Sequence, residues 1–206
     1  MQLIGYMDSP FVRRTAISMQ FLGIDYEHRE LSIFRDFEEF RSINPMVKVP
    51  TLLLDSGEVL VDSTLIIAYL ESQLARRSLM PDDGADYLAA VQQIGVALLC
   101  MEKVASIIYE TTQRPVDLQH QPWIDRLEIQ LKGAVELMES YVSDCPDGTW
   151  LSGSALSQAD ISTAVAWRFI QHIDRVKRDP VDYPALAAFS ARAEALPEFV
   201  ACPLSD

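Results

Sequence analysis

Ser9, followed by Pro10, is the first residue of the chain whose type and position could do chemistry. A short apolar run at residues 3–6 precedes the pair, and a helical pattern follows it. Serine is a preferred N-cap and proline is favoured at the first helical position, so the pair predicts a helix start. The same hydroxyl could also donate a hydrogen bond to an anion held at the positive end of the helix dipole. By itself the pair indicates only a cap.

A second candidate is Val49-Pro50, which comes just before an apolar run. Proline cannot donate to a strand ladder, so it should precede the paired part of the strand. A cis bond would leave the N–H and C=O of Val49 free to pair with a peptide-like ligand as an added strand. An ordinary trans turn is the alternative, and the sequence leaves the isomer open.

The third candidate is Asp62-Ser63, between an apolar strand pattern and a helical one. Ser63 could simply cap that helix. Alternatively, its hydroxyl and the N–H groups of the first turn could hold a carboxylate. Arg13 and Arg14 add a cluster of positive charge that a small anion could use, although two solvated arginines on a first helix fit the pattern as well.

Composition excludes several classes of function. The 206-residue chain has 17 basic and 30 acidic residues and a net charge of -13, so it should repel nucleic acid. We expect no membrane segment and a cytoplasmic location, because no apolar run approaches the ~20 residues of a membrane span and no secretion signal is visible. The cysteines and histidines are too scattered for a disulfide framework or a metal site. They are Cys100, Cys145, Cys202, His28, His120 and His172.

The periodicity predicts two regions of different class. Strands are expected at 3–6, 26–31, 51–54 and 59–61, with the last two pairing antiparallel around an Asp-Ser-Gly-Glu turn. Helices are expected at 10–23, at 37–42 and from Ser63 onward. The second region reads as helices only, and one of them should bury a stripe through Val91, Ile94, Leu98, Met101, Ala105 and Ile108. Ser157 and Asp160 form a capping-box pattern with a structural role.

In this order the motifs resemble the glutathione transferase superfamily, in particular its serine-type bacterial branch. SPFVRR at 9–14 looks like the activating serine motif, and NPMVKVPTL at 44–52 like the cis-proline segment. VDSTLIIAYL at 61–70 looks like the γ-glutamyl-binding segment, and SQAD at 157–160 like the helix-capping box. The resemblance implies a thioredoxin-like α/β domain at 1–75, a linker at 76–84 and an all-helical domain at 85–206.

The resemblance also implies a site for glutathione as co-substrate. Ser9 would be the catalytic residue, donating to the glutathione sulfur and stabilising its thiolate. Val49, next to Pro50, would bind the cysteinyl backbone, Asp62 and Ser63 the γ-glutamyl group, and Lys48 would approach the glycyl carboxylate. Asp62 departs from the glutamate common there, so its contact with the ligand's ammonium group is left open.

A hydrophobic electrophile would bind between the two domains. Its pocket is expected to include Tyr6, Phe11, Ile108 and Tyr109, and Tyr6 is also the rival of Ser9 as the donor to sulfur. No cysteine lies at the serine junction, which disfavours thiol-disulfide exchange by a protein sulfur.

The function expected from these residues is a glutathione S-transferase of small hydrophobic electrophiles with a role in detoxification. The alternatives are a non-catalytic binding or regulatory protein, or a glutathione-dependent isomerase, peroxidase or dehalogenase. We also expect a homodimer and no metal. The dimer is suggested by the all-round apolar stretch at residues 97–101 as well as by the resemblance.

Overall fold

The first compact unit is built on a four-stranded mixed sheet. The structure is a computed structural model, and it describes residues 1–75, 77–82, 84–146 and 148–204. The strands are β1 (Gln2–Ile4), β2 (Glu27–Arg29), β3 (Thr51–Leu53) and β4 (Val59–Val61), in the order β2-β1-β3-β4. β2 runs parallel to β1 and the other pairs are antiparallel, which confirms the expected β3–β4 hairpin.

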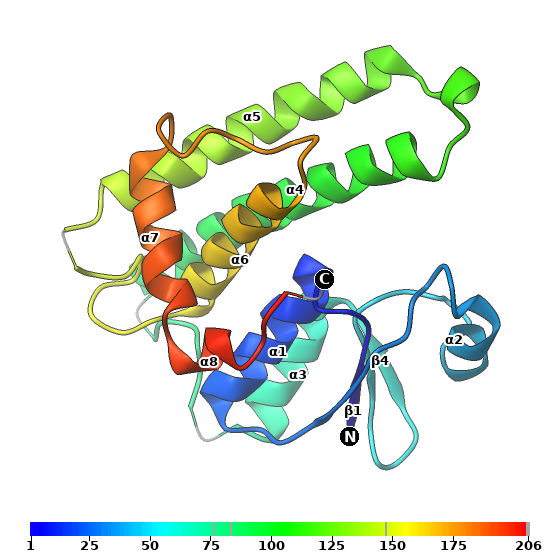
Figure 1. Cartoon of the computed structure of the whole chain (residues 1–206). Coiled ribbons are helices and arrows are strands. Elements are labelled where there is room, and N and C mark those ends of the chain that lie inside the picture. Colours follow the sequence, from blue (N-terminus) through cyan, green and yellow to red (C-terminus); the bar gives the residue numbers. More distant parts are fainter. Residues whose placement is uncertain (76, 83, 147, 205–206) are drawn as a thin grey trace. The chain divides into compact units, whose positions relative to one another are not determined.

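Helices cover both faces of this sheet. α1 (Pro10–Leu22) and α3 (Ser63–Gln73) pack against each other on one face, and α2 (Phe37–Ile43) lies on the other (Figure 1). Ile4, Leu31 and Phe40 form the buried cluster under α2. Because side chains alternate along a strand, Leu3 faces the opposite way, toward α1 and α3. The order β-α-β-α-β-β-α is the thioredoxin-like fold expected from the sequence.

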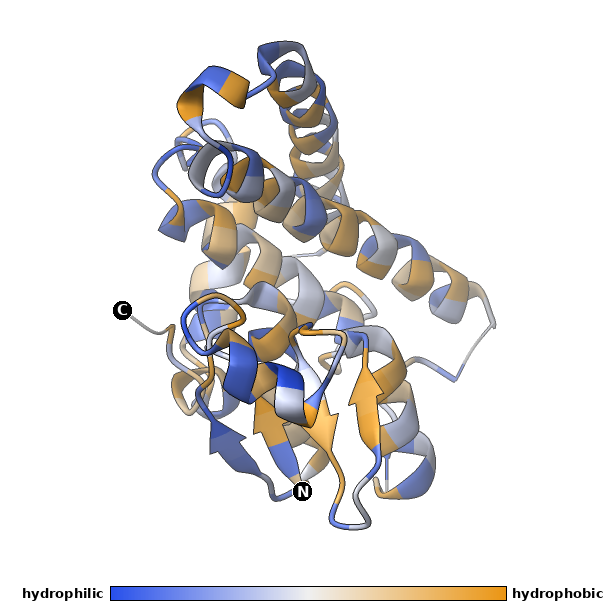
Figure 2. Cartoon of the chain, turned by 90° about the vertical axis from the view of Figure 1, so that its right-hand side faces the viewer, coloured by the Kyte–Doolittle hydropathy of each residue, from blue (hydrophilic) through white to orange (hydrophobic). Residues whose placement is uncertain are grey.

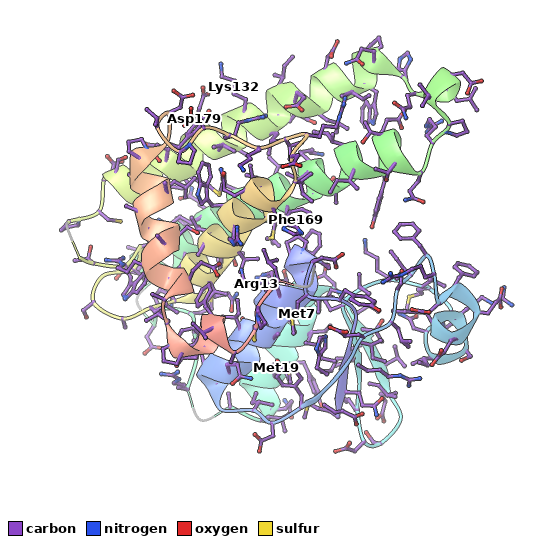
Figure 3. All side chains as sticks on the ribbon, viewed as in Figure 1. Met7, Arg13, Met19, Lys132, Phe169 and Asp179 are labelled. Carbon is purple, nitrogen blue, oxygen red and sulfur yellow. The ribbon has the colours of Figure 1, made fainter. Side chains whose placement is uncertain are left out.

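The strands of the sheet differ in polarity. β2 carries Glu27, His28 and Arg29 and is hydrophilic in Figure 2, whereas β3 and β4 are hydrophobic. Charged residues on an edge strand discourage pairing with another chain. The buried side chains Met7, Arg13 and Met19 belong to the same unit, the last two on α1 (Figure 3).

The end of the chain packs with the first unit. One compact unit comprises Met1–Leu79 and Ala195–Asp206, and the other is Met80–Glu194. The sequence instead predicts that residues 85–206 all belong to the helical domain. The ring of Phe199, in α8 (Pro197–Val200), instead packs edge-on against Phe21, and Arg13 Nε donates to the Cys202 carbonyl across 2.8 Å. Residues 76 and 83 of the expected linker lie outside the described residues.

In the described residues of the second unit, the secondary-structure elements are helices. α4 (Gly84–Thr112) packs against α5 (Gln121–Ser143) and α6 (Gln158–His172), and α7 (Pro184–Glu194) packs against α5 and α6. A short 3₁₀ turn, η1 (Val116–Leu118), joins α4 to α5. This confirms the all-helical class of the second region.

The buried face of α4 differs from the expected stripe. Val91 is 44% exposed, and the buried face runs instead through Ala90, Ile94, Ala97, Met101 and Val104. The expected stripe is wrong because α4 is apolar on most sides, so that neighbouring stripes fit a helical period equally well. Ala90 and Ile94 pack around Ala159 of α6, where small residues allow close approach. By length and composition alone, α4 also passes as a possible membrane span, as core helices can.

The capping box at the start of α6 is confirmed. The Ser157 hydroxyl accepts the Ala159 N–H at 3.2 Å, and Asp160 accepts the Ser157 N–H at 2.7 Å. Both residues are buried. Burial raises the pKa of Asp160 above its ordinary value, against the opposing effect of its hydrogen bonds.

Candidate functional site

Ser9 is the N-cap of α1, as the sequence predicts. Its hydroxyl oxygen accepts the Val12 N–H at 3.5 Å, and its own N–H donates to the Tyr6 carbonyl at 3.1 Å. Among the described residues the hydroxyl only accepts, so its proton has no protein partner. Because Ser9 is half-buried, that proton can reach solvent or a ligand at the positive end of the helix.

Gly5 brings the start of α1 close to the segment before β3. A Cβ at this position would lie 2.7 Å from Val12 Cγ2 and 2.8 Å from Val49 Cγ1. The φ angle of Gly5 is 134°, a value that residues with a side chain rarely adopt. Glycine therefore allows Val12 and Val49 both to lie close to the backbone at the end of β1, a few residues before Ser9.

Val49 presents an unpaired backbone edge. The Val49-Pro50 bond is cis, and within the described part of the chain neither the N–H nor the C=O of Val49 has a hydrogen-bond partner. Buried groups hold this loop: Asn44 Nδ2 donates to Thr51 Oγ1 at 2.8 Å, and that hydroxyl donates to the Lys48 carbonyl at 2.7 Å. The Lys48 side chain is exposed. A free N–H and C=O on one residue can pair with a peptide backbone.

Asp62 rather than Ser63 caps α3. Asp62 Oδ1 accepts the N–H of Thr64 at 2.9 Å and that of Leu65 at 3.2 Å. Ser63 is the first helical residue, and it is buried. The N-cap role that the sequence allowed for Ser63 is therefore wrong. Asp62 takes that role because a carboxylate one residue earlier reaches both N–H groups.

Arg14 lies directly beneath Ser63. Its Nη1 donates to Ser63 Oγ at 2.8 Å and to Thr64 Oγ1 at 3.1 Å. Burial lowers the pKa of Arg14 to about 10, and the charge of Asp62 partly opposes this. The guanidinium therefore stays protonated at neutral pH.

Of the two alternatives for Arg13 and Arg14, the one in which both side chains are solvated is wrong. Arg13 is 2% exposed and Arg14 is 1% exposed. Their partners come from segments far away in the sequence, Cys202 for Arg13 and Ser63 for Arg14. Arg13 also lies over the Phe199 ring, 5.9 Å from its centre.

The expected electrophile-pocket residues fall in different units. Tyr6 and Phe11 flank Ser9 in the first unit and are half-buried, and Arg35 lies over the Tyr6 ring, 5.2 Å from its centre. Ile108 is half-buried and Tyr109 is 42% exposed, both on α4 in the second unit. A pocket shared by these four residues stays a prediction.

Sequence reasoning missed three contributors to this site, namely Gly5, Arg14 as a buried partner, and Thr64. Gly5 ends a strand directly before the serine motif, which is a usable signal for a close backbone approach. The burial of Arg14 had no local signal, since its partners lie about fifty residues away.

The described residues contain no cluster of three or more histidine, cysteine, aspartate or glutamate side chains that could hold a metal ion. A cavity of about 290 Å³ lies at the opposite end of α1 from Ser9. Its lining comprises Met19, Gln20, Gly23, Ile24, Asp25, Tyr26 and His28.

Known proteins share both halves of this architecture. The family profile described as "Glutathione S-transferase, N-terminal domain" matches residues 3–78, and "Glutathione S-transferase, C-terminal domain" matches residues 121–192. "Probable maleylacetoacetate isomerase 1" of Drosophila melanogaster is 28% identical, over 97% of this chain and 79% of its own length. A maleylacetoacetate isomerase of Pseudomonas aeruginosa is 34% identical over 48% of each chain.

A solved structure supports the fold. The crystal structure of a glutathione S-transferase from Methylobacterium radiotolerans, in complex with glutathione sulfonate, has a TM-score of 0.89. It is 24% identical, with 100% of this chain and 95% of that one covered. At this identity the likeness speaks for the fold alone.

Proposed function

The chain belongs to the glutathione S-transferase superfamily, and from that premise we propose that it is a glutathione-dependent cis–trans isomerase of a maleyl-type unsaturated acid. The observation that carries the proposal is the likeness to a probable maleylacetoacetate isomerase across 97% of the chain. Among the glutathione reactions expected from the sequence, we therefore prefer isomerisation to conjugation of a hydrophobic electrophile.

Glutathione binds along the first unit in this proposal. The free N–H and C=O of Val49 pair with the cysteinyl backbone, and Ser63 at the start of α3 holds the γ-glutamyl group. Lys48, whose side chain is exposed, reaches the glycyl carboxylate. The cysteinyl sulfur then lies by Ser9, since Gly5 keeps Val49 and the start of α1 together.

The Ser9 hydroxyl supplies the donor that the sulfur needs. A free thiol has a pKa near 8.5, so little of it is ionised at neutral pH, and the thiolate is the nucleophile. A charge-assisted hydrogen bond contributes about 1.5 to 3 kcal/mol, and the helix dipole adds to it. This lowers the thiol pKa by about one to two units, which makes the thiolate abundant at pH 7.

Isomerisation uses this thiolate without consuming it. The sulfur adds to one carbon of the cis double bond, and the displaced electron pair moves onto the conjugated carbonyl oxygen. The former double bond is now single and rotates. The electron pair then returns to form the trans double bond and expels the thiolate, so glutathione is regenerated.

The experiment combines the protein with glutathione and maleylacetoacetate and follows both reactants. We expect the trans isomer to accumulate, by proton magnetic resonance, while the free thiol concentration stays constant. Stoichiometric loss of thiol would instead identify a conjugating transferase. Failure to bind glutathione at millimolar concentration, by calorimetry, would favour a non-catalytic protein.

We also propose that the protein is a homodimer. Tyr87, Leu88, Val91 and Leu99 of α4 are exposed apolar side chains on the same helix. Such a row of apolar surface fits a subunit contact. Sedimentation at micromolar concentration tests this, and a monomer would contradict it.

A further inference from the structure

A buried cation lies beneath the proposed γ-glutamyl site, and the described residues give it no ion-pair partner. Arg14 is 1% exposed, and in the part of the chain that the structure describes its guanidinium pairs with hydroxyl groups and with no carboxylate. Among those same residues its Nε has no hydrogen-bond partner. Burying an unpaired charge is costly, so a bound anion near Arg14 would stabilise this arrangement.

Asp62, the acid whose charge acts on Arg14, does not fill that role. Asp62 contributes attraction to Arg14, but its Oδ1 is occupied by the N–H groups of Thr64 and Leu65. The residue is exposed, so solvent weakens its charge. Positive charge therefore remains beneath the start of α3.

The contacts of Arg14 also fix the direction of two hydroxyl groups. A hydroxyl has one proton and two lone pairs, and Arg14 occupies a lone pair on Ser63 Oγ and another on Thr64 Oγ1. The proton of Ser63 is then turned away from the cation. The N–H of Ser63 has no partner within the described residues, and it lies at the positive end of α3.

We propose that Arg14 is a positioning residue for the α-carboxylate of the γ-glutamyl group, acting through Ser63. It orients the Ser63 hydroxyl as a donor and provides the buried countercharge for the bound carboxylate. Arg14 does not touch the ligand. The inference rests on the proposed function, because it assumes that glutathione binds at the start of α3.

The test compares two probes by calorimetry, glutathione and the analogue whose γ-glutamyl α-carboxylate is a carboxamide. The wild-type protein should bind glutathione at least about tenfold more tightly than the amide, since a charge-assisted hydrogen bond exceeds a neutral one by that order. In Arg14→Gln, which keeps a donor but loses the charge, the two affinities should agree within about threefold.

Arg13 offers a matched control. It is the neighbouring residue, it is buried to the same degree, and its Nε donates to the Cys202 carbonyl rather than to the site. Arg13→Gln should cost stability while leaving the ratio of the two affinities as in the wild type. A merely structural role for Arg14 would give the same result for both variants.

Two results would overturn the inference: a folded Arg14→Gln with the wild-type ratio, or a wild-type protein that binds both probes equally. Should Arg14→Gln not fold, Arg14→Lys decides, because it keeps the cation but loses the two-hydroxyl contact. In Arg14→Lys the affinity for glutathione divided by that for the amide should lie between one and the wild-type value. A ratio equal to the wild-type value counts against the inference. Binding of neither probe by the wild type would instead reject the proposed function itself.

Discussion

A serine stands at the start of each of the helices α1, α3 and α6, but the hydroxyl protons of these serines differ in their partners. At α6 the Ser157 hydroxyl donates to Asp160 at 2.7 Å while accepting the Ala159 N–H. Asp160 also accepts the N–H groups of Leu151 and Ser157, each at 2.7 Å. These contacts are all internal, so within the described residues the Ser157 hydroxyl and the Asp160 carboxylate have partners without a ligand.

Ser9 and Ser63 have hydroxyl oxygens that only accept, from Val12 and Arg14 respectively. Neither proton has an acceptor within the described part of the chain. We call Ser9 and Ser63 the open serines and Ser157 the closed serine. All three serines stand at helix starts, so the capping pattern does not distinguish them, whereas the presence or absence of an internal acceptor for the hydroxyl proton does.

The largest expected effect is at the start of α6, where the closed serine Ser157 lies. Asp160→Asn places an amide among three donors that use both carboxylate oxygens, and burial prevents water from replacing them. We expect a loss of about 3 kcal/mol of unfolding free energy, measured by urea denaturation. Asp62→Asn is the control. In the described part of the chain only one oxygen of Asp62 accepts a hydrogen bond, and asparagine caps equally well, so the cost of this change should stay below about 0.5 kcal/mol. Equal costs would contradict the distinction between the two starts.

Gly5→Ala tests how the open serine Ser9 is placed beside Val49. The new methyl group would overlap Val12 and Val49, and the positive φ adds strain, so we expect about 2 to 3 kcal/mol of destabilisation and weaker glutathione binding. Gly23→Ala is matched in φ sign but has nothing within 4 Å of the new atom. It should cost about 1 kcal/mol and leave binding unchanged. Unaltered glutathione affinity in a folded Gly5→Ala variant would contradict the role of Gly5 in placing Ser9 beside Val49.

Ser63→Ala and Ser157→Ala compare an open and the closed serine directly. Each removes an internal hydrogen bond, and each should cost about 1 to 2 kcal/mol of stability. Only Ser63→Ala should weaken glutathione binding, by about tenfold, because only its proton is available to a ligand. Calorimetry on both variants decides, and a parallel loss of affinity in Ser157→Ala would break the comparison.

The fold was predictable wherever the signals were local. Proline after serine located α1, the Asp-Ser-Gly-Glu turn located the β3–β4 hairpin, and Ser157 with Asp160 located α6. The order of these motifs then predicted the thioredoxin-like and helical regions. The predicted ends of the elements differ from the observed ends by up to a few residues, since strands such as Gln2–Ile4 are short.

The rest depended on long-range contacts. Arg13 and Arg14 are next to each other in the sequence, yet Arg13 donates to Cys202 and Arg14 to Ser63, two residues far away along the chain. The buried face of α4 was set by Ala159 on another helix, so the apolar pattern of α4 alone pointed to Val91. The N-cap of α3 is Asp62 and not Ser63, because the cap depends on which side chain reaches the free N–H groups and not on residue preference alone.

The smallest effect on stability, and the most direct test of the mechanism, is expected at Ser9. Its contact with Val12 is 3.5 Å long, so Ser9→Ala should cost only about 0.5 to 1 kcal/mol of unfolding free energy. Its effect should fall instead on the bound sulfur. The pH dependence of the reaction rate should shift upward with the thiol pKa, since less thiolate is then present at neutral pH.

The decisive measurement is the ionisation of bound glutathione, followed by ultraviolet absorbance of the thiolate against pH in the wild type and in Ser9→Ala. We predict a bound thiol pKa about one to two units below the free value in the wild type, and a return toward the free value in the variant. Equal ionisation in the two proteins, with glutathione bound in both, would contradict the role of Ser9.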